Sequence, residues 1–183
     1  MYFVERIYMT GEITNYSIGL AVAADIPFIA PIEAAAASIF PESVLPIPQR
    51  QETIPADLLQ QARVENRLWV AQQDGQPVGF ILADRVGEWG WIQEVCVHPD
   101  VGRRGIGKQL IRQVIEWSRQ QQCQYVGLTT FRDVAWNGPF YQRIGFTAFD
   151  SLPIPEFLQQ ALAGEREWSR FYRMAMHYPL NPL

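Results

Sequence analysis

The stretch from Trp91 to Arg112 constrains the fold of this chain more than any other part of its sequence. Residues 91–97 are rich in β-branched and aromatic side chains, and the run His98-Pro99-Asp100 ends them, which predicts a strand. After a glycine-containing segment, 102–107, apolar residues recur at the spacing of a helix face. These residues are Ile106, Leu110, Ile111, Val114, Ile115 and Trp117. The stretch therefore predicts a buried strand, a tight loop and an amphipathic helix.

The predicted loop has the chemistry of an anion site. The first turn of a helix leaves backbone N–H groups unpaired and partly positive, and glycines let a ligand approach that backbone closely. No acidic residue interrupts the chain from Val101 to Val114, and its cations are Arg103, Arg104, Lys108 and Arg112. We expect a phosphate or pyrophosphate here. The alternative is an ordinary strand–helix turn with solvated arginines. A dinucleotide fingerprint is excluded because Leu110 stands where a third glycine would fall.

Composition bounds the class of protein. The chain has 183 residues, of which 48% are hydrophobic and 19% charged, which predicts one globular domain. Its net charge of −4 argues against a general nucleic-acid partner. Cys96 and Cys123 have no metal-ligand spacing and there are only two histidines, so we expect no metal and interpret the thiols as those of a cytoplasmic protein. Asp25 and Glu33, with two prolines, interrupt the apolar stretch 18–40, so we expect no membrane span.

The rest of the chain predicts strands alternating with a few helices. Strands are expected at 16–23, 68–73, 78–84, 124–130 and 171–176. Helices are expected after Asp25, after Pro55 and within 151–164, and Asp74-Gly75 predicts a hairpin turn. The fold class is therefore α/β (α+β), with a mixed, mostly antiparallel sheet flanked by helices. We divide the chain into an N-terminal extension (1–15), a single domain (16–178) and a C-terminal tail (179–183).

Two motifs resemble those of the GNAT superfamily of N-acetyltransferases. The strand, Gly105, Gly107 and the apolar helix resemble its acyl-CoA-binding motif, Gln/Arg-x-x-Gly-x-Gly/Ala. Gly102 stands at the first position of that motif, with an arginine one residue later. The run Tyr141-x-x-x-Gly145-Phe146, preceded by Asn137, resembles the second signature of the superfamily, although its Asn–Tyr spacer is short and Gly138-Pro139 replaces an alanine-bearing turn.

The resemblance implies an acetyl-CoA-dependent N-acetyltransferase that transfers acetyl to a primary amine by direct attack in a ternary complex. The residues implied to contact the cosubstrate are Val95, Cys96, Val97, Gly102, Arg103, Arg104, Gly105, Ile106, Gly107, Lys108, Asn137 and Arg143. The acceptor is a small-molecule amine or a protein α-amine, and 40–51 line its site. Phe40, Asp133 and Trp136 are its candidate contacts. We expect a monomer or homodimer.

Two side chains are candidates for proton transfer. Counting by twos along the strand puts Glu94 on the face of Ile92 and Cys96, where burial would raise its pKa and make it a general base. The alternative is a structural carboxylate bonded to backbone. The resemblance makes Tyr141 the acid that protonates the departing thiolate, and the alternative is a core tyrosine. We interpret Cys96 as a small core thiol rather than a nucleophile.

A competing class is a non-catalytic acyl-CoA-binding or sensory module. Such a module would keep the glycine loop but would not need Glu94 or Tyr141. An α/β interaction domain without any cosubstrate would not need the cations beside Gly105 and Gly107. The acceptor loops carry no code that identifies the amine.

Overall fold

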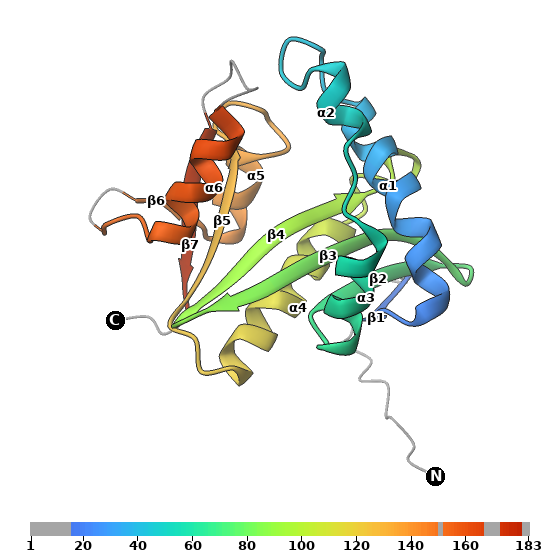
Figure 1. Ribbon diagram of the computed structural model, residues 1–183, viewed down its shortest axis with the longest axis horizontal. Helices are drawn as coiled ribbons and strands as arrows, with labels where there is room; N and C mark the ends of the chain where they lie inside the picture. Colours follow the sequence, from blue (N-terminus) through green and yellow to red (C-terminus); the bar gives the residue numbers. More distant parts are fainter. Residues whose placement is uncertain (1–15, 150–151, 167–172, 181–183) are drawn as a thin grey trace.

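The computed structural model describes residues 16–149, 152–166 and 173–180 (Figure 1). The expected N-terminal extension 1–15 lies outside these residues. The strands are β1 (Ser17–Leu20), β2 (Leu68–Gln73), β3 (Gln76–Val86), β4 (Trp89–Val97), β5 (Tyr125–Phe131), β6 (Thr147–Ala148) and β7 (Arg173–Pro179). The helices are α1 (Ile26–Ser38), α2 (Ile47–Gln51), α3 (Ala56–Val64), α4 (Ile106–Gln120), α5 (Gly138–Ile144) and α6 (Glu156–Arg166). Short 3₁₀ turns, η1 (Ala23–Asp25) and η2 (Pro99–Val101), precede α1 and follow β4.

Within the described residues, the strands form one seven-stranded sheet of order β1-β2-β3-β4-β5-β7-β6. Strands β1 to β4 pair antiparallel in sequence, β4 and β5 pair parallel, and β7 pairs antiparallel with both β5 and β6. The single parallel pair is the one that a helical crossover, α4, connects. The predicted mixed, mostly antiparallel α+β fold is confirmed.

The β2–β3 hairpin turns at Asp74 and Gly75. Both residues have positive φ, 51° and 77°. A tight turn with two left-handed central residues matches the twist of the flanking strands, which explains why Asp-Gly stands there. The predicted hairpin is confirmed.

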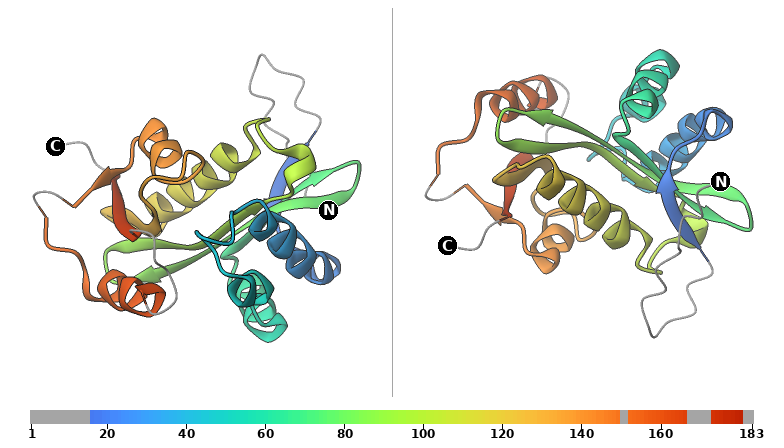
Figure 2. Two further views of the ribbon diagram at one scale, coloured as in Figure 1. Left: turned by 90° about the horizontal axis from the view of Figure 1, so that it is seen from above. Right: turned by 90° about the horizontal axis from the view of Figure 1, so that it is seen from below.

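Helices cover both faces of the sheet (Figure 2). Helices α4 and α5 lie on one face, while α1 with α2, α3 and α6 lie on the other. The apolar face of α4 is buried against the first face, as its spacing predicted, in a core that includes Ile81, Ile92 and Met176. The second face holds two smaller cores, one under α1 and α3 and one under α6. The sheet thus separates two sides on which different ligands can be held.

Asp25 precedes α1 as predicted, but its carboxylate does not cap that helix. Its Oδ2 accepts a hydrogen bond from the Val22 backbone N–H at 2.8 Å, and its Oδ1 accepts one from Gln72 Nε2 at 2.9 Å. The Asp25 carboxylate thus closes the η1 turn and links the start of α1 to β2. Pro31 lies inside α1 rather than at its first turn.

The C-terminal strand begins at Arg173 in the described part of the chain, and the expected residues 171–172 lie outside it. Strand β7 runs to Pro179, and Leu180 is buried in the main core. The structure therefore continues slightly past residue 178, where we placed the end of the domain. No helix in the described ranges combines the length and apolar character that crossing a membrane requires.

Candidate active site

The sheet splits between β4 and β5. The two strands pair only where Trp89, Gly90 and Trp91 face Tyr125, Val126 and Gly127. Beyond these residues the strands diverge, so 92–97 pair with β3 on one side and with no described strand on the other (Figure 1). An unpaired strand edge offers backbone donors and acceptors to an extended ligand.

A β-bulge at Gln93 decides which side chains face the split. Leu82 on β3 pairs with Glu94, whereas the next residue, Ala83, pairs with Ile92, which leaves Gln93 as the extra residue. A bulge reverses the alternation of side chains beyond it. Ile92 therefore packs on the α4 face, while Cys96 packs on the α1 face. Our expectation that Glu94 shares a face with both was wrong for Ile92, because counting by twos assumes an unbroken strand.

Glu94 is partly buried on the α1 face. Its Oε1 accepts hydrogen bonds from the Val95 backbone N–H at 3.1 Å and from Cys96 Sγ at 3.4 Å. Burial raises the pKa of Glu94, while the bonds from Cys96 and Val95 and the positive charge of Arg173 oppose that rise. A carboxylate whose pKa is raised takes up a proton more readily than an ordinary one, which suits a general base.

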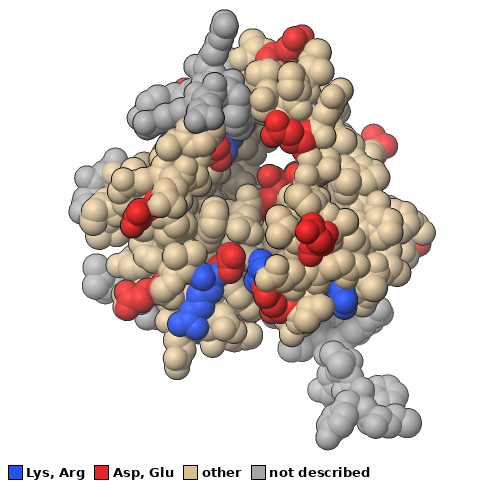
Figure 3. Space-filling model, in the orientation of Figure 1, with Lys and Arg blue, Asp and Glu red and all other residues tan. Residues whose placement is uncertain are grey.

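Glu33, on α1, is a second carboxylate at this place that sequence reasoning missed. Its Oε2 accepts a hydrogen bond from the Ile54 backbone N–H at 3.0 Å. The pKa of Glu33 is raised to about 7, chiefly by burial; the Ile54 bond opposes the rise and the negative charge of Glu94 adds to it. Figure 3 shows acidic atoms inside a hollow between the side formed by α1 and α2 and the side formed by α6. The one signal in the sequence that could have identified Glu33 is that it is an acidic residue among the apolar positions of α1.

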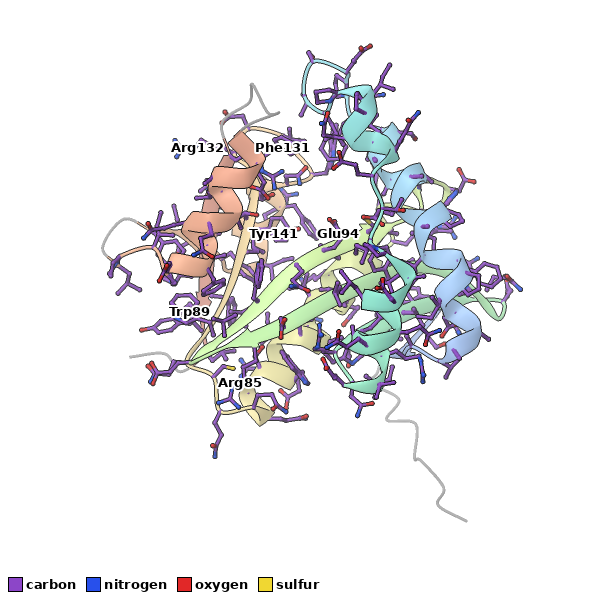
Figure 4. All side chains as sticks on the ribbon, in the orientation of Figure 1. Arg85, Trp89, Glu94, Phe131, Arg132 and Tyr141 are labelled. Carbon is purple, nitrogen blue, oxygen red and sulfur yellow. The ribbon has the colours of Figure 1, made fainter. Side chains whose placement is uncertain are left out.

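Tyr141 reaches the same place from the opposite face of the sheet. It lies on α5, is 7% exposed, and packs in the α4-side core against Phe140 and Phe146. Burial and the negative charge of Glu94 raise its pKa, with a contribution from Cys96, so the phenol stays protonated. Its hydroxyl has no hydrogen-bond partner among the described residues. Figure 4 shows Glu94 and Tyr141 on the two sides of the split between β4 and β5.

An ion pair stands on the β7 and α6 side of the site. Arg173 donates from Nε to Glu165 Oε2 at 2.8 Å and from a second guanidinium nitrogen to Oε1, which also accepts from Thr129 Oγ1. The Arg173 guanidinium lies 4.3 Å from the centre of the Phe131 ring. Arg173 lowers, and Glu165 raises, the pKa of Glu94. This pair therefore contributes to the electrostatics of the split.

Aromatic side chains connect the two sides of the hollow. The ring of Phe40, just past α1, lies 5.5 Å from that of Phe131, at the end of β5, and 5.6 Å from that of Trp136. Trp136 is 47% exposed and Asp133 is exposed. Two of the three predicted acceptor contacts, Phe40 and Trp136, are thus brought together by a ring contact in which Asp133 has no part.

The glycine loop has the predicted backbone form. Arg103 and Gly105 have positive φ, 62° and 80°, and Gly105 is the N-cap of α4 without any capping side chain. The backbone N–H groups of the first turn of α4 are therefore left for a ligand. The cations around them are all exposed: Arg103, Arg104, Lys108 and Arg112. Ile106 is buried in the core, so only its backbone can contact a ligand.

The remaining predicted contacts differ in how they are placed. The side chains of Val95 and Val97 pack against the α4-side core, so a ligand can reach only their backbone, and the Val95 N–H already donates to Glu94 Oε1. Asn137 is the N-cap of α5, and its Oδ1 is buried without a hydrogen-bond partner in the described part of the chain. Arg143 is exposed on α5. Gly145 ends α5 in the left-handed region, with φ 114°, as the Tyr-x-x-x-Gly-Phe motif predicted.

Comparison with known proteins identifies the family. The sequence matches the acetyltransferase (GNAT) family over residues 32–146, and the chain belongs to that family. An uncharacterised N-acetyltransferase of Methanocaldococcus jannaschii is 33% identical over 91 residues, which are 46% of this chain and 40% of that protein. The chain therefore matches less than half the length of that curated relative.

Solved structures share the fold. The ribosomal-protein-S18-alanine N-acetyltransferase of Escherichia coli superposes with a TM-score of 0.64 at 18% identity, covering 92% of this chain and 96% of that one. The PaiA N-acetyltransferase of Thermoplasma acidophilum, solved with coenzyme A, has a TM-score of 0.67 at 16% identity, covering 90% and 98%. Rv2747 of Mycobacterium tuberculosis, solved with CoA and NLQ, has a TM-score of 0.67 at 20% identity, covering 90% and 99%.

Proposed function

We propose that this protein is an N-acetyltransferase that moves an acetyl group from acetyl-CoA to a primary amine by direct attack in a ternary complex. The observation that carries the proposal is that Glu94 acts electrostatically on Tyr141, which lies on the opposite face of the sheet, where β4 separates from β5. Membership of the GNAT family and the CoA-bound structures of the same fold support it.

The residues present fit acetyl-CoA. The N-terminus of α4, with left-handed Gly105 and exposed Arg104 and Lys108 beside it, suits the pyrophosphate. The unpaired edge of 95–97 suits the amide-bearing pantetheine arm, because those amides pair like a strand. Asn137 and Arg143 are further candidate contacts. The described residues hold no group of three metal-ligating side chains, and the proposal requires no metal.

The proposed chemistry assigns one proton to each candidate. Acetyl-CoA supplies the acetyl group as a thioester. An alkylamine with a pKa of about 10 must lose a proton before it attacks, and Glu94 accepts it directly or through water. As the bond from nitrogen to the acetyl carbon forms, the carbon–sulfur bond breaks and Tyr141 donates its proton to the thiolate. Because the pKa of Tyr141 is raised, its hydroxyl is protonated before the thiolate departs.

The acceptor binds, in this proposal, on the α1 side of the split. Phe40, just past α1, is in ring contact with Trp136, and acidic side chains lie within the hollow (Figure 3). Negative charge and aromatic surface both favour a cationic amine. The acceptor is a small amine or a protein α-amine.

The test is release of the CoA thiol from acetyl-CoA with a panel of amines, comparing wild type with Glu94→Gln. We expect amine-dependent thiol release that the variant loses by about 10²-fold or more, while CoA still binds in calorimetry. CoA binding without turnover on any amine would favour the sensory module. An absence of CoA binding would contradict the proposal.

A further inference from the structure

We propose that Glu33 is the second carboxylate of the acceptor site: with Glu94 it binds the acceptor as an ammonium ion, so the substrate is a cationic primary amine carried on an apolar or aromatic group. This inference rests on the proposed acetyl transfer and names the class of its acceptor.

The first support is the way Glu33 is held. Helix α1 presents buried Ile29 and Ile32 to the sheet, and Glu33 lies beside them, partly buried. The backbone N–H of Ile54 bonds one carboxylate oxygen, Oε2, at 3.0 Å. The other oxygen, Oε1, has no donor among the described residues. One oxygen is thus fixed by the fold and the other is left for a ligand.

The second support is the charge around the pair. The negative charge of Glu94 raises the pKa of Glu33, and the charges of both carboxylates raise the pKa of Cys96. Arg173, the cation that acts on Glu94, is already bound by Glu165. A bound ammonium would relieve the repulsion, because it places a positive charge between two carboxylates.

The third support is a buried donor on the other side of the split. The Tyr141 hydroxyl belongs to a side chain only 7% exposed, has no hydrogen-bond partner in the described chain, and interacts electrostatically with Glu94 and Cys96. A hydroxyl without a protein partner can donate its hydrogen bond to a ligand. The two carboxylates and this hydroxyl can therefore form hydrogen bonds to one and the same ligand.

The fourth support concerns the group that carries the amine. Phe40 follows Glu33 by two helical turns, which puts it on the same side of α1 and its continuation. Its ring contacts those of Phe131, at the end of β5, and Trp136. A chain leading from the ammonium out of the site passes this aromatic surface. Apolar and aromatic carriers are favoured there, and an anionic group next to the amine is disfavoured by Glu33.

The two carboxylates then have different tasks. Glu33 keeps the positive charge in the site, and Glu94, on the strand at the split, takes the proton when the amine is ready to attack. The charged or titratable groups that face Glu94 are Glu33, Cys96, Glu165, Arg173 and Tyr141. Of these, Glu33 comes from α1 and can be changed without removing a hydrogen bond to Glu94.

The experiment compares steady-state kinetics of wild type, Glu33→Gln and Glu33→Asp. The matched control is Glu42→Gln, which changes an exposed acid just beyond α1. Two amine substrates are tested: an arylalkyl monoamine, and a short peptide with a free, apolar N-terminal residue. The activity with each is compared with the activity with an anionic amino acid. We expect Glu33→Gln to raise the KM for the amine about tenfold or more with a smaller change in kcat, and Glu33→Asp to recover part of that loss.

A second readout is the pH dependence of kcat/KM for the amine. Only the ionised form of Glu33 pairs with an ammonium ion, and its pKa is raised to about 7, so part of the rise of kcat/KM with pH around 7 should be lost in Glu33→Gln, which a purely structural role would not cause. An unchanged KM and pH profile in Glu33→Gln, with active wild type, would overturn this inference alone. Inactive wild type on every amine would overturn the proposed function and this inference with it. Coenzyme A affinity, equal in all variants, shows that they are folded.

Discussion

The chemistry of the site depends on what surrounds three side chains. Burial raises the pKa of Glu94, Cys96 and Tyr141, and each is within the electrostatic influence of at least one other. The same physical cause gives them different properties: a carboxylate that takes up a proton more readily, a thiol that stays neutral, and a phenol that keeps its proton. Cys96 therefore acts as a hydrogen-bond donor to Glu94 rather than as a thiolate nucleophile.

Replacement of Tyr141 by Phe should lower kcat by about 10²-fold, because the departing thiolate loses its proton donor. The apolar packing of the ring against Phe146 is kept, so CoA affinity should stay the same. The comparison is Tyr125→Phe, whose ring stacks on Trp89 where β4 and β5 are paired. Equal kcat in both variants would exclude the acid role of Tyr141.

Cys96 is a positioning residue for Glu94, and two substitutions separate its hydrogen bond from its volume. Cys96→Ala removes the donor to Glu94 Oε1. Since that bond lowers the pKa of Glu94, the acid limb of kcat/KM should move to higher pH in Cys96→Ala and return in Cys96→Ser. The pH profiles of the three proteins make the measurement. A shift shared by Ala and Ser would indicate altered packing instead.

At the scale of elements, two local irregularities define the site. The bulge at Gln93 turns Glu94 toward α1, and the early separation of β4 from β5 lets α5 bring Tyr141 to it. The left-handed turn at Gly105 starts α4 directly after the strand and loop. Regular strands and a regular helix start would have left these three features apart.

Gly105→Ala should destabilise the protein by about 1–2 kcal/mol, because a Cβ is strained at φ 80°. It should also weaken CoA binding. The matched control is Gly164→Ala within α6, where a Cβ meets nothing within 4 Å; it should stabilise the fold by about 0.5–1 kcal/mol. Denaturant unfolding and calorimetry measure both. A destabilised fold with unchanged CoA affinity in Gly105→Ala would contradict the role of the loop.

The sequence alone predicted the features that depend on a periodic pattern or on a single residue type, such as a turn-forming glycine. Apolar spacing predicted α4 and its buried face, Asp74-Gly75 predicted a turn, and Gly145 predicted the end of α5. The sequence correctly predicted that Glu94 shares a strand face with Cys96 but wrongly included Ile92, because the bulge inserts one residue and breaks the alternation of side chains. Glu33 was missed because its nearness to Glu94 arises from packing between α1 and β4, which no local pattern encodes.

The whole molecule keeps charges of opposite sign at different places. Its net charge is −4, yet exposed cations surround the start of α4 and acidic side chains lie in the hollow on the other face of the sheet. In the proposed reaction, this separation attracts the anionic cosubstrate and the cationic acceptor to different sides of the sheet, and the two sides meet at the split between β4 and β5. This separation is a consequence of the fold, since the sheet lies between α4 and α1.

The free energy of unfolding should also depend on pH because of Glu33, the partly buried acid on α1. The pKa of Glu33 is raised from 4.5 to about 7, so the folded state binds a proton that the unfolded state has released over that range. The free energy of unfolding therefore falls as pH rises from about 4.5 to about 7. Glu33→Gln should remove on the order of 1–3 kcal/mol of this fall. Urea unfolding of both proteins across the range measures it, and parallel curves would contradict the raised pKa.

The most direct test of the central claim follows the acetyl group itself. Wild-type protein is incubated with isotopically labelled acetyl-CoA and an arylalkyl amine, and the amine and the protein are both examined by mass spectrometry. The account predicts labelled N-acetylamine that forms only with both substrates present, with no label on Cys96 and little product from Glu94→Gln. Label that remains on the protein, or an amine that stays unmodified while CoA binds, would contradict direct transfer.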